Sequence, residues 1–308
     1  GQWTFTTVSS HDRLQEQTGR FLVTDAPANA AGFWKWGRLE AVGTAENRIR
    51  YLKFRDGPYW LKAGCDDPEN FLGKSSHYDS LGKRKAAVDY LARRGINSLY
   101  IMTHNLDGDD NDVWPWLGES PREAKANSGA GSRFDLAKLD EWFELFQYMQ
   151  ERGLVVHLVL EDDGAWKDYD HGRYYRELVA RFGHLPGLIC NFNEEHNENY
   201  RLSEALDYMR LLASIDPYDH PRGIHNVNAP SHEYIAAPDI DFTSIQTGSP
   251  GGRNPGAVAH NQQAIDWIDR CKSQGARVLM LGFDEGRPEH DRRAWWSAYL
   301  GGGVWEAH

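Results

Sequence analysis

The sequence lacks several features that would place the protein in a well-defined class. It has no run of about 18 apolar residues, which a membrane-spanning helix requires. Its three cysteines (Cys65, Cys190 and Cys271) are too few and too scattered for a disulfide scaffold or a zinc knuckle. Basic residues are outnumbered, with 34 Lys and Arg against 45 Asp and Glu, and the net charge of −11 repels phosphate backbones. We therefore expect neither a membrane nor a nucleic acid as partner.

Aromatic residues are abundant. The 308 residues include 12 Trp, 14 Tyr and 12 Phe, and 40% of the chain is hydrophobic, enough for a sizeable core. Part of this aromatic content belongs to the core. An acidic, Trp-rich composition is also typical of sugar-binding proteins, because flat rings stack on pyranose faces.

The two ends of the sequence indicate a piece of a longer protein. The chain opens at Gly1, and no signal peptide is visible. Residues 4–10 and 19–27 have strand character, and two strands need further partners to be stable. The C-terminal strand has no helix after it, so we expect the fold to continue beyond His308.

From about residue 57 the pattern alternates between strand and helix. Helical periods lie at 84–94, 135–152, 202–215 and 257–274. Strands are predicted at 58–64, 96–103, 153–161, 187–192, 222–227, 240–247, 276–283 and 302–307. Eight strands over about 250 residues predict an α/β fold, the (β/α)8 TIM barrel. A doubly wound sheet is the runner-up, but CDDPENF stands after the first strand where that fold has a glycine fingerprint.

In such a barrel, functional side chains lie where strands end and the following loops begin. Polar and aromatic residues gather at these positions. We expect the substrate-binding residues to be Asp66, Asn70, Asn105, Trp114, Trp116, Glu161, Trp166, Asn193, His225, Gln246 and Trp305.

Acidic doublets follow the fourth and seventh strands: Glu194 with Glu195, and Asp284 with Glu285. Glycosidic cleavage needs two carboxyl groups flanking the scissile bond, one to protonate the leaving oxygen and one to attack or to activate water. Ends of strands four and seven can face each other across a sugar. Acids at loop starts also cap helices, so the doublets alone do not establish catalysis.

Three other patterns favour ordinary explanations. The run 107–112 has calcium-loop spacing, but Asp112 stands where glycine is required, so we expect a solvated loop. His104, His157 and His225 could indicate a metal-dependent hydrolase, but no His-x-His pair lies at the first strand. Cys65 has no evident base beside it. We expect no cofactor and no metal.

Several segments resemble a family of candidate glycoside hydrolases, related to clan A, that join an N-terminal β-sandwich to a (β/α)8 barrel. The resemblance covers most of the chain, and its most specific parts are YYRELVARFGHLPG with NEEH. The segments that carry it are KAGCDDPENFL (62–72), YYRELVARFGHLPG (174–187), CNFNEEHN (190–197), DPYDHP (216–221), FDEG (283–286) and the GGGVWEA end. It implies the end of the sandwich and a linker in 1–50, and a catalytic barrel in 51–308.

The resemblance also implies catalytic roles. The acid/base falls on Glu195, or on Glu194 if the literal Asn193-Glu194 pair is aligned with the Asn-Glu usual in clan A. We prefer Glu195, kept protonated by the neighbouring Glu194 and by burial. For the nucleophile we prefer Glu285 over Asp284. Two departures from the family are Glu194 in place of the usual Asn and Cys190 in place of Trp.

The leading hypothesis is therefore a glycoside hydrolase, retaining in mechanism, that acts on a poly- or oligosaccharide. The substrate class places it in the secreted or periplasmic compartment. The rivals are a carbohydrate-binding barrel without catalysis and a metal-dependent hydrolase. The sugar, the linkage and the oligomeric state do not follow from the sequence.

Overall fold

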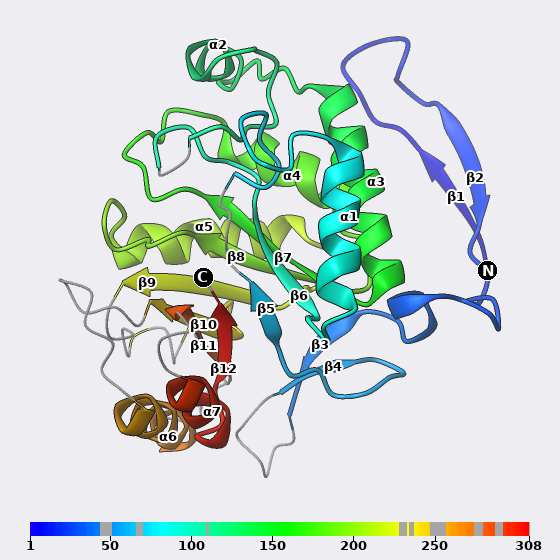
Figure 1. Cartoon of the computed structure of the whole chain (residues 1–308). Helices are drawn as coiled ribbons and strands as arrows, with labels where there is room; N and C mark the ends of the chain where they lie inside the picture. Colours follow the sequence, from blue (N-terminus) through cyan, green and yellow to red (C-terminus); the bar gives the residue numbers. More distant parts are fainter. Residues whose placement is uncertain are drawn as a thin grey trace.

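The computed structural model describes residues 1–43, 51–65, 70–108, 111–227, 233, 237–246, 257–273, 280–286 and 292–307 (Figure 1). For some residues of the later strands, Asp284, Glu285 and Trp305 among them, only the backbone is described. No helix in these ranges is both long and apolar enough to cross a bilayer.

Eight parallel strands close into a barrel in the order β10-β11-β12-β5-β6-β7-β8-β9. This confirms the predicted (β/α)8 architecture. The strands are β5 (Ala63–Cys65), β6 (Ser98–Met102), β7 (Val155–Glu161), β8 (Leu188–Asn193), β9 (Arg222–Val227), β10 (Phe242–Gln246), β11 (Met280–Gly286) and β12 (Val304–Ala307).

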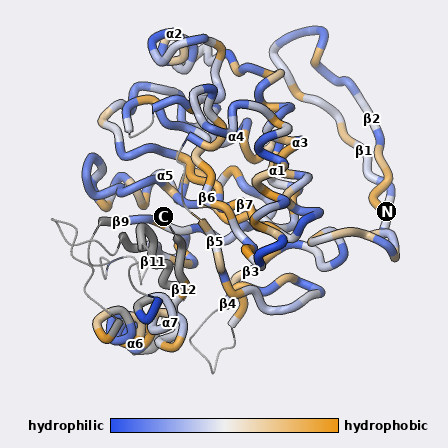
Figure 2. Tube along the Cα trace, viewed as in Figure 1, coloured by the Kyte–Doolittle hydropathy of each residue, from blue (hydrophilic) through white to orange (hydrophobic). Residues whose placement is uncertain are grey.

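The helices surround this barrel (Figure 1). Figure 2 shows the apolar residues concentrated along the strands, with polar residues on the outside. Asp135 and Asp170 cap two helices, since each side chain accepts a backbone N–H of the first turn. The helices are α1 (Leu81–Ala92), α2 (Pro121–Ala126), α3 (Leu136–Arg152), α4 (His171–Phe182), α5 (Leu202–Ile215), α6 (Ala257–Ser273) and α7 (Arg292–Leu300).

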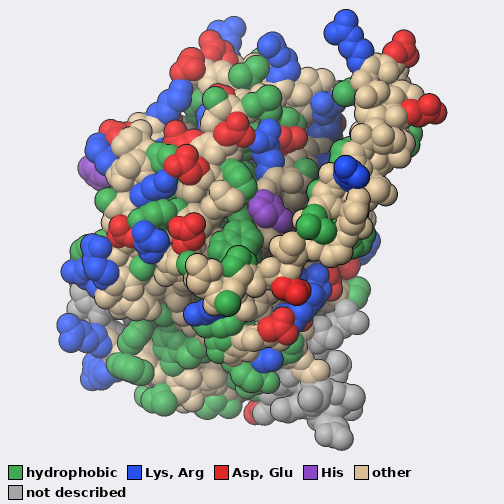
Figure 3. All heavy atoms as spheres, turned by 90° about the vertical axis from the view of Figure 1, so that its right-hand side faces the viewer, with side chains coloured by type: hydrophobic (Ala, Val, Ile, Leu, Met, Phe, Trp, Pro, Cys, Tyr) green, Lys and Arg blue, Asp and Glu red, His purple; other side chains and the backbone are tan. Residues whose placement is uncertain are grey.

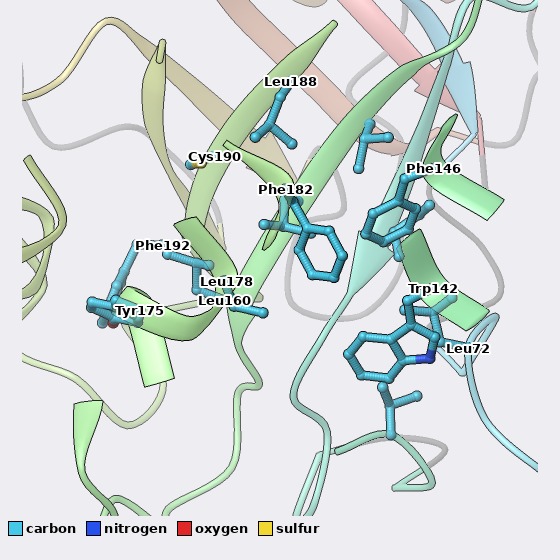
Figure 4. Packing of buried hydrophobic residues seen from close by; sticks show 14 of the residues in the cluster. Leu72, Trp142, Phe146, Leu160, Tyr175, Leu178, Phe182, Leu188, Cys190 and Phe192 are labelled. Carbon is cyan, nitrogen blue, oxygen red and sulfur yellow. The ribbon is translucent and has the colours of Figure 1, made fainter. Parts of the chain in front are cut away.

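The main core lies between the strands and the helices. Trp142 and Phe146 of α3 are buried against Phe182 of α4, with 4.9 Å between the centroids of the two Phe rings (Figure 4). Burial of each such side chain contributes about 1.5–3 kcal/mol. This layer holds β6, β7 and β8 in place, and with them the loops that follow these strands.

The N-terminal end of the barrel is closed by a separate apolar plug. A 3-10 turn, η1 (Gly32–Lys35), precedes the antiparallel pair β3 (Leu39–Val42) and β4 (Tyr51–Phe54). Phe33 and Phe54 pack against Val155 and Ile189, near the starts of β7 and β8. The plug leaves the carboxyl end of the barrel for function.

The first barrel strand begins later than the predicted 58–64. The segment before it turns back onto β4, where the Phe54 amide donates to the Pro58 carbonyl and the Trp60 amide donates to the Leu52 carbonyl. Trp60 is buried in the plug. The apolar character of 58–61 thus serves the plug, and pairing within the barrel starts at Ala63.

The chain begins with a hairpin of β1 (Gln2–Thr6) and β2 (Thr18–Leu22), shorter than the predicted strands. Trp3 lies opposite Phe21, and these side chains are 59% and 52% exposed. Figures 1 and 3 show the hairpin standing out from the barrel. In the described N-terminal residues we find this hairpin and the β3–β4 pair, but no β-sandwich.

Candidate active site

The end of β8 directs one carboxyl group into the mouth of the barrel. Glu194 is 7% exposed, and its Oε2 accepts a hydrogen bond from the Tyr100 hydroxyl of β6. The same oxygen lies 3.1 Å from His225 Nδ1 of β9. Side chains of β6 and β9 therefore hold this carboxyl group, with little exposure to solvent, at the end of β8.

The neighbouring Glu195 has a different environment. Its φ of 39° lies in the left-handed region, and its side chain is only partly buried. This turn directs the Glu195 amide N–H at His225 Nδ1, at 3.3 Å. His225 Nδ1 thus lies between the Glu195 amide and the Glu194 carboxyl group.

Two asparagines of β8 line the same mouth. Asn191 Nδ2 donates to the Tyr100 hydroxyl at 3.3 Å and so orients the donor to Glu194. Asn193 is fully buried, and neither atom of its amide has a hydrogen-bond partner in the described part of the chain. An unpaired buried amide is costly unless a ligand satisfies it, so Asn193 is available to a polar ligand.

A second buried group lies at the ends of β6 and β7. Glu161 is completely buried and accepts a hydrogen bond from the Tyr175 hydroxyl at 2.6 Å. Its other oxygen is 3.7 Å from His104 Nδ1. Burial raises the pKa of Glu161 well above its usual range and lowers the pKa of His104. We expect both groups to be neutral near pH 7.

The buried, neutral Glu161 should make stability depend on pH. Between its unfolded pKa near 4.5 and its higher folded pKa, the folded protein binds the extra proton, so stability falls with rising pH by ~1.4 kcal/mol per unit. Glu161→Gln never ionises and keeps the acceptor for Tyr175. In urea unfolding it should be more stable than the wild type at pH 8 and about equal at pH 4.

The control is Glu151→Gln, an exposed acid on α3 that should behave alike at both pH values. An equal effect of Glu161→Gln at pH 4 and pH 8 would show that Glu161 is ionised in the folded protein.

The tryptophans of the loop after β6 are packed into the core. Trp114 and Trp116 are 3% and 0% exposed, and the Trp116 ring meets Trp166 edge-on at 6.2 Å. Trp166 is partly buried, and its ring lies 5.8 Å from that of His104. These rings form a wall behind the polar residues. Asn70 and Asn105 are also buried at this end of the barrel.

Other predicted site residues are described only in part. Asp66 lies outside the described residues. Gln246, Asp284, Glu285 and Trp305 are placed by their backbone alone, with Gln246 paired to Asp284 and Trp305 paired to Ala63. The pairing register of β11 with β12 shifts between Phe283 and Gly286.

Two contributors to the site were not predicted. Tyr100 lies inside the predicted strand 96–103, where only the alternation of inward and outward residues could have indicated it. Asp162 directly follows the predicted strand 153–161. Its role emerges only from the loops around it.

Three carboxylates could hold a cation. Oxygens of Asp163, Glu195 and Glu198 all lie within 4.8 Å of one another. Exposed acidic groups of this kind are common without an ion, and the arrangement alone does not define a metal site.

The comparison with known proteins rests on structure. No protein-family model matches the sequence, and no curated protein matches it. A Bacteroides vulgatus protein described as a candidate glycoside hydrolase aligns with a TM-score of 0.72 at 16% identity. The alignment covers 99% of this chain and 61% of that one, so the chain spans less than two thirds of that protein.

Other similar structures belong to glycoside hydrolase family 5. One from Bacteroides vulgatus has a TM-score of 0.61 at 13% identity, covering 89% of this chain and 64% of that one. A mannosidase from Rhizomucor miehei, bound to mannosyl-fructose, has a TM-score of 0.56 at 12% identity, covering 89% and 86%. At these identities the likeness establishes the fold.

Proposed function

We propose that the protein is a glycoside hydrolase that cleaves glycosidic bonds of a poly- or oligosaccharide with two carboxyl groups. Glu194 is the general acid/base, and a carboxylate of β11 is the nucleophile. The environment of Glu194 carries the proposal. This carboxyl group is 7% exposed at the end of β8, and Tyr100 of β6 and His225 of β9 hold it in the barrel mouth, in the fixed position that a general acid needs.

The position of Glu194 supports the alternative alignment, in which Asn193-Glu194 is the Asn-Glu pair. The Glu194 carboxyl group lies in the barrel mouth, between Tyr100 and His225. Glu195 has a left-handed backbone conformation, and its backbone amide donates to His225. Asn193 lies directly before the acid with an unpaired, buried amide. We propose that this amide binds a hydroxyl group of the sugar.

The nucleophile is proposed from β11, three strands along the barrel from β8. Glu285 is the first choice, because clan A uses a Glu at this position, and Asp284 is the second; both lie in β11. The proposed mechanism is retaining, which requires the nucleophile to lie about 5 Å from the acid.

The sugar-binding surface is proposed from the remaining residues around the mouth. Glu161 is bonded to Tyr175, and the Trp116 ring is packed against the Trp166 and Tyr169 rings, so we assign both to the wall behind this surface. The residues proposed to contact the sugar are Asp66, Asn70, Asn105, Trp166, Asn193, His225, Gln246 and Trp305, with Trp114 beside them.

The test is the stereochemistry of the product. Mannan-derived β-1,4 oligosaccharides head a panel of substrates, because several similar structures are described as mannosidases or a mannanase. Proton NMR during turnover should show the first-formed sugar with the anomeric configuration of the substrate. Inversion would overturn the nucleophile assignment. Binding without turnover across the panel would favour the non-catalytic carbohydrate-binding barrel.

We further propose that residues 1–50 are the end of an N-terminal β-sandwich and a linker, with the hairpin β1–β2 as the sandwich edge, joined to the barrel of residues 51–308. The exposed aromatic side chains Trp3 and Phe21 support this, because a two-stranded ribbon needs further strands to bury such a face. The substrate class supports a secreted or periplasmic location.

A further inference from the structure

The loops that follow β6 and β7 are locked together by one buried carboxylate. Asp162 Oδ2 accepts the backbone N–H groups of Leu106 and Asp107 at 2.6 and 3.0 Å, and that of Gly108 at 3.4 Å. Its Oδ1 accepts the Gly164 amide at 3.2 Å. Asp162 is completely buried, so these bonds replace all of its hydration.

This arrangement requires a carboxylate and two glycines. Successive backbone N–H groups form a nest that favours negative charge, whereas an amide would turn an N–H₂ donor towards another donor. A Cβ at Gly164 would lie 2.5 Å from Asp107 Cβ, and one at Gly108 would lie 2.2 Å from Asp163 Oδ1. The two loops therefore approach too closely for side chains at these positions.

The locked loop carries Asn105. This residue exchanges two backbone hydrogen bonds with Val113, at 2.7 and 3.1 Å, which close the loop on itself. At its far end, Asp112 accepts a hydrogen bond from the Ser75 hydroxyl at 2.7 Å and so ties the loop to the one after β5. The acidic run 107–112 thus joins neighbouring loops around the barrel mouth.

We infer that Asp162 is a positioning residue that holds the loop after β6, and through it Asn105, at the sugar-binding surface. The inference rests on the proposed function. Asp162 itself contacts backbone amides and takes no part in proton transfer.

The first test is hydrogen exchange followed by mass spectrometry on the whole chain. In Asp162→Asn, the peptide containing the amides of 106–108 should exchange about 10- to 100-fold faster, as expected for losing charge-assisted hydrogen bonds. Asp168→Asn makes the same charge change at an exposed position of the loop after β7 and should leave that peptide unchanged. Unchanged exchange in Asp162→Asn would overturn the inference.

A second variant tests the same contact between the loops in case Asp162→Asn does not fold. Gly164→Ala separates the same two loops without altering charge and should also accelerate exchange in the 106–108 peptide. If Asp162→Asn does not fold, this variant alone decides, with unchanged exchange as the contradicting result.

The second test asks whether Asp162 acts through Asn105. Values of kcat/KM, or oligosaccharide affinity if turnover is absent, are compared for Asp162→Asn, Asn105→Ala and the double variant. A positioning role predicts that Asp162→Asn adds little once Asn105 is replaced. Independent, additive losses would overturn it.

The two proposals fail in different ways. If the wild type binds sugar but does not hydrolyse it, the proposed function fails and the affinity cycle still decides the role of Asp162. If hydrolysis occurs and the cycle is additive, only the inference about Asp162 fails. If the wild type neither binds nor hydrolyses the panel, the proposed function and the inference about Asp162 both fail. The hydrogen bonds of Asp162 then have a purely structural role.

Discussion

Glu194→Gln is expected to lower kcat/KM on an oligosaccharide by about 10²- to 10⁴-fold, the range typical of a lost general acid. Gln has the same shape and can still accept the hydrogen bond from Tyr100 but cannot release a proton. The matched control is Glu195→Gln. Its side chain is partly exposed and its backbone amide, which meets His225, is unchanged, so we expect less than about a tenfold loss.

A change of leaving group separates the two catalytic roles. The dinitrophenolate released from a dinitrophenyl glycoside is a stable anion that leaves without protonation. On this substrate Glu194→Gln should therefore retain most of the wild-type rate of glycosidic bond cleavage. The nucleophile variant, Glu285→Gln or Asp284→Asn, should lose activity on both kinds of substrate. The opposite ranking, with Glu195→Gln inactive and Glu194→Gln active, would assign the acid to Glu195.

The second large effect concerns stability. Arg84→Met is expected to reduce the free energy of unfolding by about 3–5 kcal/mol, because three buried carbonyls lose a charged hydrogen-bond donor. Arg84 is 4% exposed, and burial lowers its pKa against the opposing effect of Glu141. Its guanidinium donates to the carbonyls of Phe71, Leu72 and Gly73, and to the Glu141 carboxylate of α3.

Methionine would fill much of the volume but leave three buried carbonyls without a donor. The measurement is the urea midpoint at an unchanged denaturant slope. Lys83→Met, at an exposed i,i+4 pair with Asp79, is the control and should cost less than about 0.5 kcal/mol. A loss below about 1 kcal/mol for Arg84→Met would show that water replaces the guanidinium at these carbonyls.

Glu194 and Arg84 differ in how far the sequence indicates their roles. Glu194 belongs to an acidic doublet visible in the sequence, and a (β/α)8 barrel places such a doublet at the functional end. Arg84 has no pattern that distinguishes it from the other basic residues of α1. Its importance comes from the folding of the loop at 70–73 over the helix.

Much of the architecture followed from the sequence alone. The helix predicted at 202–215 and the strand at 222–227 form at those residues, as α5 and β9. Local patterns suffice there because apolar spacing and stop signals act within a few residues. The same alternation of strands and helices predicted a closed parallel barrel, and hence which ends of the strands carry function.

The proposed choice of Glu194 over Glu195 depends on tertiary structure. A left-handed turn at Glu195 breaks the alternation of strand side chains, and its amide meets a histidine on the next strand. Glu161 and Trp116 are likewise buried by loops far apart in sequence. The hydrogen bonds of Asp162 also join two such loops. Sequence periodicity reports which face of an element is apolar. It does not report which distant backbone amides or carboxylates meet that face, and those contacts decide the protonation and position of each group in the site.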